Sequence, residues 1–150
     1  MNRLTLHNQK GFTFAEIVVV LAIFFIVISI TFVSLKPLIR HIQVNNFFEQ
    51  LQLDAAYSQM YALSNYKEVQ IIFFPENHSY EITAGFNKLS LVKRGYSSKI
   101  AIQPITLPTT VIFLANGTIK KAGKMYVHYY DDVYAFVFLF GKGQTYVEKL

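Results

Sequence analysis

The sequence predicts an α+β fold, with one long N-terminal helix and an antiparallel β-sheet packed on the outer half of that helix. Three observations support this architecture. An uncharged apolar run covers residues 17–35, helical spacing of apolar residues without Gly or Pro continues over residues 38–66, and a period of two follows. A chain of 150 residues is long enough for one compact domain and an appendage.

The apolar run has the length of a membrane span. It reads IVVVLAIFFIVISITFVSL, and at about 1.5 Å per residue this helix covers about 28 Å, close to the hydrocarbon thickness of a bilayer. Arg3 and Lys10 precede the run and favour an N-in orientation, although Lys36 and Arg40 follow it and weaken the asymmetry. We therefore expect a transmembrane helix over residues 12–36. A cleaved secretory signal is the alternative, but it requires a shorter apolar core and a small-residue site after it.

The helix is expected to run on past the apolar segment, from near Phe14 to near Ser64. Pro37 directly follows the segment, and we expect it to kink the helix rather than end it. Residues 37–66 would form the outer half, with one face packed on the sheet. The side chains expected on that face are Val44, Phe47, Phe48, Leu51, Ala55, Ala62 and Tyr66.

Residues 67–150 are expected to form the sheet domain. Asn116-Gly117 is the strongest short hairpin signal in the chain, and Asp131-Asp132 and Gly141-Lys142-Gly143 are expected to be turns of a C-terminal meander. The expected strands cover residues 68–74, 79–84, 88–94, 99–103, 110–115, 125–130, 133–140 and 144–149.

The junction before the apolar run reads Lys10-Gly11-Phe12-Thr13-Phe14-Ala15-Glu16. A glycine before a scissile bond lets a peptidase approach the backbone closely, which suits Gly11. A carboxylate at the edge of an apolar helix is costly, up to about 2.5–3.5 kcal/mol at mid-bilayer, so Glu16 needs a partner or a place at headgroup level. As a joint pattern, this junction resembles the type III signal of the type IV prepilins and pseudopilins.

The resemblance implies that residues 1–11 are a leader, removed by a prepilin peptidase between Gly11 and Phe12. Phe12 would then be N-methylated, and Glu16 would stand fifth in the mature chain. When helices stack with an axial stagger, Glu16 of one subunit can meet the terminal cation of the next, and a low dielectric strengthens that attraction. The precursor would be a single-pass membrane protein, and the processed subunit would enter a filament on the cell surface.

The C-terminal part narrows the resemblance to minor pseudopilins. The H-type minor pseudopilins of type II secretion show a similar run to Ile112-Phe113, Asn116-Gly117-Thr118, Gly123 and Gly141-Lys142-Gly143. In combination with Leu53-Asp54-Ala55, Gln59, Ala62 and the ending at residues 146–150, this run resembles the minor pseudopilins of Gram-positive competence systems. That implies a role in filament assembly and DNA uptake, with the major and other minor pseudopilins as partners. An assembly ATPase and a membrane platform protein would act indirectly. A subunit of a type II secretion or other pilus system is the alternative.

The composition offers little for catalysis. The chain has no cysteine, which excludes a disulfide, a thiol nucleophile and a zinc–thiolate site. Asp131 and Asp132 are better explained by turn formation than by acid–base work. The four histidines, which lack metal-ligand spacing, are His7, His41, His78 and His128. We expect no enzyme, no metal and no cofactor.

The chain has a mild excess of basic residues, with a formal net charge of +5, and this excess is compatible with binding to nucleic acid. Two basic stretches could contact DNA. The first holds Lys120, Lys121 and Lys124, and the second holds Lys88, Lys93, Arg94 and Lys99 with the aromatic Tyr96 inside it. The plainer interpretation is a pair of solvated loop faces. The candidate DNA contacts are Lys93, Arg94, Lys120, Lys121 and Lys124.

Overall fold

The computed structural model describes residues 13–140 and 144–150, with the backbone alone for residues 31–38. The chain divides into two compact units, residues 1–41 and 42–150, and the second is called the globular unit below. Helix α1, Phe14–Asn65, belongs to both. The long helix predicted from the sequence is therefore confirmed, and it continues through Pro37. The expected kink at Pro37 stays a prediction.

The end of α1 is set by local backbone geometry. Tyr66 adopts a left-handed conformation with φ of 52°, and the Lys67 N–H donates to the Ala62 carbonyl at 3.2 Å, as in a Schellman cap. The expectation that Tyr66 lies on the buried face is wrong, since its side chain is 83% exposed. It leaves the helical periodicity because it is the first residue beyond the helix.

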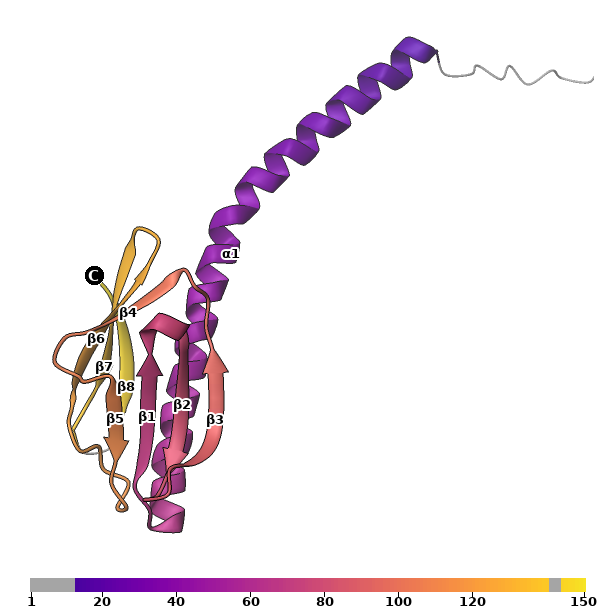
Figure 1. Cartoon of the computed structure of the whole chain (residues 1–150). Coiled ribbons are helices and arrows are strands. Elements are labelled where there is room, and N and C mark those ends of the chain that lie inside the picture. Colours follow the sequence, from indigo (N-terminus) through magenta and orange to yellow (C-terminus); the bar gives the residue numbers. More distant parts are fainter. Residues whose placement is uncertain (1–12, 141–143) are drawn as a thin grey trace, which may run out of the picture. The chain divides into compact units, whose positions relative to one another are not determined.

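Four strands form one antiparallel sheet, called sheet A, in the order β3-β2-β1-β5. A short 3-10 turn, η1 (Pro75–Asn77), joins β1 to β2. Figure 1 shows these strands beside the second half of α1. The strands are β1 (Val69–Phe74), β2 (Ser79–Ala84), β3 (Leu89–Gly95) and β5 (Thr110–Phe113).

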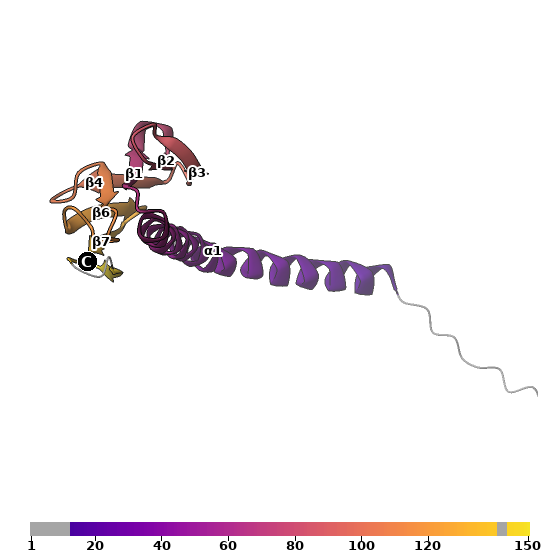
Figure 2. The same ribbon diagram turned by 90° about the horizontal axis from the view of Figure 1, so that it is seen from below.

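The other four strands form a second antiparallel sheet, called sheet B, in the order β4-β6-β7-β8. Figure 2 shows β1 to β3 and β4, β6 and β7 as separate groups of strands beside the end of α1. We expected a single sheet, but β4 leaves sheet A and pairs with β6, while β5 returns to β1. The strands are β4 (Ile100–Pro104), β6 (Gly123–Tyr129), β7 (Asp132–Phe138) and β8 (Thr145–Lys149).

Two predicted turns differ in detail. Asn116-Gly117 makes a tight turn, but only one bridge, Phe113 to Ile119, follows it, because the chain then crosses to sheet B. Asp132 is not a turn residue, because it is the first residue of β7. Its carboxylate forms an ion pair with the Lys149 ammonium at 2.7 Å. The expected turn at residues 141–143 lies outside the described residues.

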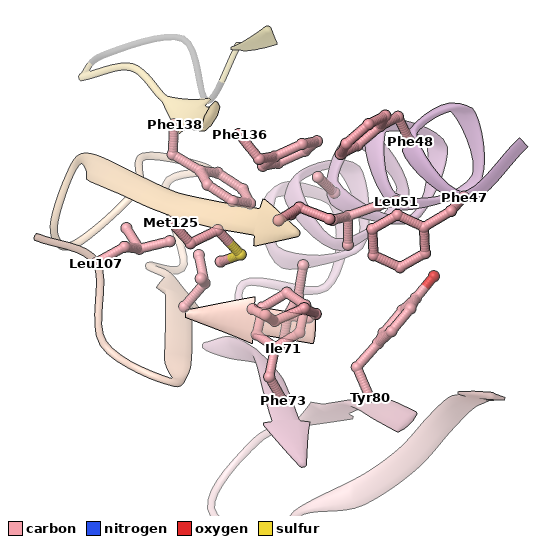
Figure 3. Close-up of a cluster of buried hydrophobic side chains, with 14 of the residues drawn as sticks. Phe47, Phe48, Leu51, Ile71, Phe73, Tyr80, Leu107, Met125, Phe136 and Phe138 are labelled. Atoms are coloured by element: carbon pink, nitrogen blue, oxygen red, sulfur yellow. The ribbon is translucent and has the colours of Figure 1, made fainter. Parts of the chain in front are cut away.

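The core of the globular unit lies between one face of α1 and both sheets. The six helix residues other than Tyr66 expected on that face are all buried, which confirms this part of the prediction. Figure 3 shows Leu51 between Ile71 of sheet A and Phe136 of sheet B. Phe48 packs on Tyr134 and Phe136, with ring centroids 5.2 and 6.2 Å apart. Aromatic pairs at such distances add about 0.5–1.5 kcal/mol to the burial of their area.

A buried carboxylate ties α1 to sheet A. Asp54 accepts hydrogen bonds from the Tyr80 hydroxyl at 2.7 Å, from Gln50 Nε2 at 3.0 Å and from Arg94 Nε at 3.1 Å. Burial and the bond to Asp54 raise the pKa of Tyr80, and the same carboxylate raises the pKa of Arg94. A buried charge is tolerated when it is paired and hydrogen-bonded, and Asp54 is both.

Tyr96, just after β3, holds a buried hydroxyl that has no hydrogen-bond partner among the described residues. Its ring packs edge-on against Phe47, with centroids 5.3 Å apart. Burial raises the pKa of Tyr96 to about 12. The side chain therefore contributes through the packing of its ring.

The ion pair gives a first prediction. We expect Arg94→Ala to lower the free energy of unfolding by about 1–3 kcal/mol, because it leaves the Asp54 carboxylate buried without its cation. Adding Asp54→Asn should recover part of the loss, since a neutral amide needs no counter-ion. Urea unfolding of the full chain in mild detergent, followed by the fluorescence of its 10 tyrosines, measures both. Lys93→Ala, an exposed neighbour, is the control; equal effects at both positions would contradict the prediction.

The second prediction concerns alkaline pH. An unfolded tyrosine loses its proton near pH 10, whereas folded Tyr96 keeps it up to about pH 12. The folded state therefore binds more protons in this interval, and stability falls as pH rises from about 10 to 12. Tyr96→Phe should retain the stability at pH 8 and reduce this fall. An unchanged slope in urea unfolding between pH 10 and 12 would rule the contribution out.

Candidate functional site

The N-terminal end of α1 is closed by two reciprocal hydrogen bonds. The Thr13 backbone N–H donates to Glu16 Oε2 at 3.4 Å, and the Glu16 backbone N–H donates to Thr13 Oγ1 at 3.3 Å. This is a capping box, in which each side chain satisfies a backbone donor that the helix leaves without a partner. Gly11 and Phe12 lie outside the described residues, so cleavage and methylation there stay predictions.

The capping box was missed in the sequence, although a recognisable signal is present. Thr13 and Glu16 have the Thr-x-x-Glu spacing directly before an apolar run. Glu16 therefore has a local role, since a carboxylate in the first helical turn also interacts favourably with the helix dipole. Its pairing with the terminal amine of another subunit stays a prediction, and it would have to compete with this cap.

The first part of α1 presents apolar side chains on all sides. Phe14 is 83% exposed, and the large apolar residues from 17 to 30 other than Ile28 are roughly half exposed or more. Ser29 is accommodated by donating its hydroxyl to the Phe25 carbonyl at 2.7 Å. No helix within the described part of the chain is long and apolar enough to span a membrane. The side chains of residues 31–35, the end of the apolar run, lie outside the described residues.

The candidate DNA contacts do not gather on one surface. Lys93 and Arg94 lie on β3, at one edge of sheet A, whereas Lys120 and Lys121 follow β5, at the opposite edge. Arg94 is bound to Asp54, which gives it a structural role that the sequence did not reveal. Lys124 belongs to β6 in sheet B, with its ammonium 5.4 Å from the ring centroid of Tyr126.

Lys120 and Lys121 border a hollow of about 400 Å³ beside Thr110 of β5. The Lys120 backbone N–H donates to the Ile112 carbonyl at 2.8 Å, which holds this segment against the strand. The hollow could receive an anionic group, because two lysines and a hydroxyl face it without a carboxylate among its lining residues. Contact with DNA by these residues stays a prediction.

The residues considered for catalysis or metal binding are dispersed. Among the residues that the structure describes, no group of three His, Asp or Glu side chains could hold a metal ion. His128 bonds Gln103 at 3.0 Å, and His78 packs edge-on against Tyr96. His7 lies outside the described residues.

Residues 6–32 match the family model of the prokaryotic N-terminal methylation motif, which includes Gly11, Phe12 and Glu16. The chain is 27% identical over 144 residues to competence protein ComGD of Bacillus subtilis (strain 168), covering 96% of both chains.

Two solved structures share the fold. The type IV minor pilin FimU of Pseudomonas aeruginosa aligns with a TM-score of 0.55 at 15% identity, over 67% of this chain and 84% of FimU. The minor pseudopilin EpsH from the type 2 secretion system of Vibrio cholerae aligns with a TM-score of 0.56 at 6% identity, over 71% of this chain and 97% of EpsH. The protein therefore combines a match to the prokaryotic N-terminal methylation motif with an α+β fold shared with a type IV minor pilin and a minor pseudopilin, and it is similar to ComGD over 96% of its length.

Proposed function

We propose that this chain is a minor pseudopilin of a competence pilus, needed for filament assembly and for DNA uptake across the cell envelope. The observation that carries the proposal is the similarity to competence protein ComGD over 96% of both chains, joined to a methylation motif at residues 6–32. The precursor is anchored in the membrane with its N-terminus inside. After cleavage the subunit enters a filament at the cell surface.

The competence assignment is favoured over a secretion system by the sequence comparison. EpsH, from a type 2 secretion system, shares the fold at 6% identity, whereas ComGD is 27% identical over an alignment of 144 residues. Likeness of fold alone does not distinguish the two systems, because one fold serves many functions. A pseudopilin of a type II secretion or other pilus system is the alternative.

The first part of α1 supports assembly on physical grounds. Its exposed apolar residues would be covered first by lipid and then by other helices, so extraction from the membrane keeps apolar surface away from water. The net cost of the transfer is then small enough for an ATPase-driven machine. The partners are a prepilin peptidase and the major and other minor pseudopilins, with the assembly ATPase and membrane platform protein acting indirectly.

DNA uptake does not require this subunit to touch DNA. A pilus-displayed DNA-binding module would be favoured by a continuous basic surface. The separation of Lys93 and Arg94 from Lys120 and Lys121 by the width of sheet A argues against one surface that includes all five candidates. We therefore assign the subunit a structural role in the filament.

Processing provides the third prediction. In cells with a prepilin peptidase, we expect the protein to lose Met1–Gly11 and to begin with an N-methylated Phe12. In cells without the peptidase the full precursor should accumulate in the membrane. Intact mass and N-terminal sequencing measure both states. A mature chain that begins near Leu35 would show an ordinary signal peptide instead.

The fourth prediction separates two roles of Glu16. Glutamine at this position can still cap the helix, because Glu and Gln both complete a capping box, but it removes the negative charge. We expect Glu16→Gln to insert and be cleaved normally, yet to reduce filament incorporation and transformation at least tenfold.

Thr13→Ala is the matched control, because it weakens the cap and keeps the carboxylate. We expect it to reduce filament incorporation less than Glu16→Gln does. Wild-type filament levels and transformation with Glu16→Gln would show that capping alone explains the residue. Immunoblots of sheared filament fractions and transformation counts provide the two readouts.

A further inference from the structure

The second half of α1 has two apolar faces, and the sheets cover only one of them. On the opposite face, large apolar side chains remain exposed to solvent; they are Leu53 (66%), Tyr57 (43%), Met60 (70%) and Leu63 (54%). Ala56 lies among them and is exposed as well. These five residues, all within the globular unit, are called the outer stripe below.

The outer stripe has the spacing of a helix–helix seam. Steps of three, four and three residues, which are those of the a and d positions of a heptad, join Leu53, Ala56, Met60 and Leu63. In such a seam four residues at i, i+3, i+4 and i+7 surround a hole for one side chain of the facing helix. Here those four are Leu53, Ala56, Tyr57 and Met60. The small Ala56 gives the hole its depth, so the face fits another α-helix.

No exposed charge interrupts the outer stripe. Within residues 50–66 the sole charged side chain is Asp54, which is buried and bound to Arg94. A helix that lies on a membrane surface carries lysine or arginine along its border, and a nucleic-acid surface needs the same cations. The facing helix must also be apolar and uncharged, because a charge buried in the seam would have no partner.

The proposed function supplies helices of this chemistry. As a minor subunit, this chain has other pseudopilins as its neighbours in the filament. Their assembly helices must pass from lipid into a bundle of helices, which requires an apolar surface without charge. The first part of α1 in this chain has that composition, with no charged residue from Ile17 to Leu35.

We propose that the outer stripe packs against the apolar helix of a different pseudopilin, and that a large side chain of that helix sits over Ala56. The Tyr57 ring packs on that of Tyr61, with centroids 6.0 Å apart, which restricts one wall of the hole. The seam is about 15 Å long by helical rise, so it is weak by itself and adds to the other contacts of the subunit. The inference rests on the proposed function, because that role provides the partner.

A photoreactive side chain tests the contact directly. In cells that make the complete set of pseudopilins, p-benzoylphenylalanine replaces Met60 in the full-length protein. We expect a cross-link that mass spectrometry maps to the apolar helix of another pseudopilin, at least tenfold stronger than from the same residue at Glu76, an exposed control position. Cross-links mainly to lipid, to a second copy or to a sheet domain would overturn the proposal, and so would equal yields at both positions.

Two substitutions test the shape and the charge of the seam. Ala56→Phe fills the hole, and Met60→Lys places a charge in an apolar contact. Both positions are exposed, so the midpoint of urea unfolding should stay unchanged. We expect each variant to reduce incorporation into sheared filaments at least tenfold. Ala56→Ser, which keeps a small side chain, and Asn65→Lys, which adds a charge outside the outer stripe, should incorporate normally. Wild-type incorporation of Ala56→Phe and Met60→Lys would refute the contact.

The same experiments separate this contact from the proposed function. If the unmodified protein is absent from filaments, or if cells without its gene take up DNA normally, the proposed function fails. The cross-link from position 60 is measured in the membrane as well as in filaments, so it decides the contact in either case.

Discussion

The globular unit depends on one buried face of α1, because the side chains of both sheets pack against this face in a single core. The residues of this face recur every three or four positions, which is the spacing of a helix stripe. Phe48 packs against sheet B through Tyr134. Three small residues are fully buried farther along the same face and allow a close approach to the helix; they are Ala55, Ser58 and Ala62. A larger side chain at these three positions would push the sheets from the helix.

Asp54 is a charged residue on this buried face, and its hydrogen bonds fix how the sheet packs on the helix. Apolar contacts tolerate small shifts, whereas a carboxylate that accepts bonds from Tyr80, Gln50 and Arg94 specifies one position of β2 and β3 against the helix. The cation is supplied by an edge strand, where it also makes that edge less suited to pairing with other strands. Arg94 thus neutralises the buried Asp54 carboxylate and also places a charge on the edge of sheet A.

The two parts of α1 meet different surroundings. In the globular unit one face is covered by the protein itself, while the first part exposes apolar side chains all around. A helix that is apolar on every side requires lipid or other helices as its solvent. The capping box at Thr13 and Glu16 satisfies two backbone donors at the start of this segment by local bonds within the chain itself.

Local patterns in the sequence determined the helix, the position of each described strand to within two residues at either end, and the methylation motif, whose match covers residues 6–32. Such features depend on contacts within a few residues, and the Thr13–Glu16 cap belongs to the same class although it was overlooked. The tertiary structure decided the division into two sheets, the burial of Asp54, the ion pair that occupies Arg94 and the separation of the basic residues. Asp54 finds Tyr80 and Arg94 at sequence separations of 26 and 40 residues. No local period encodes such pairings, because they arise only when the chain closes long loops to bury its apolar faces.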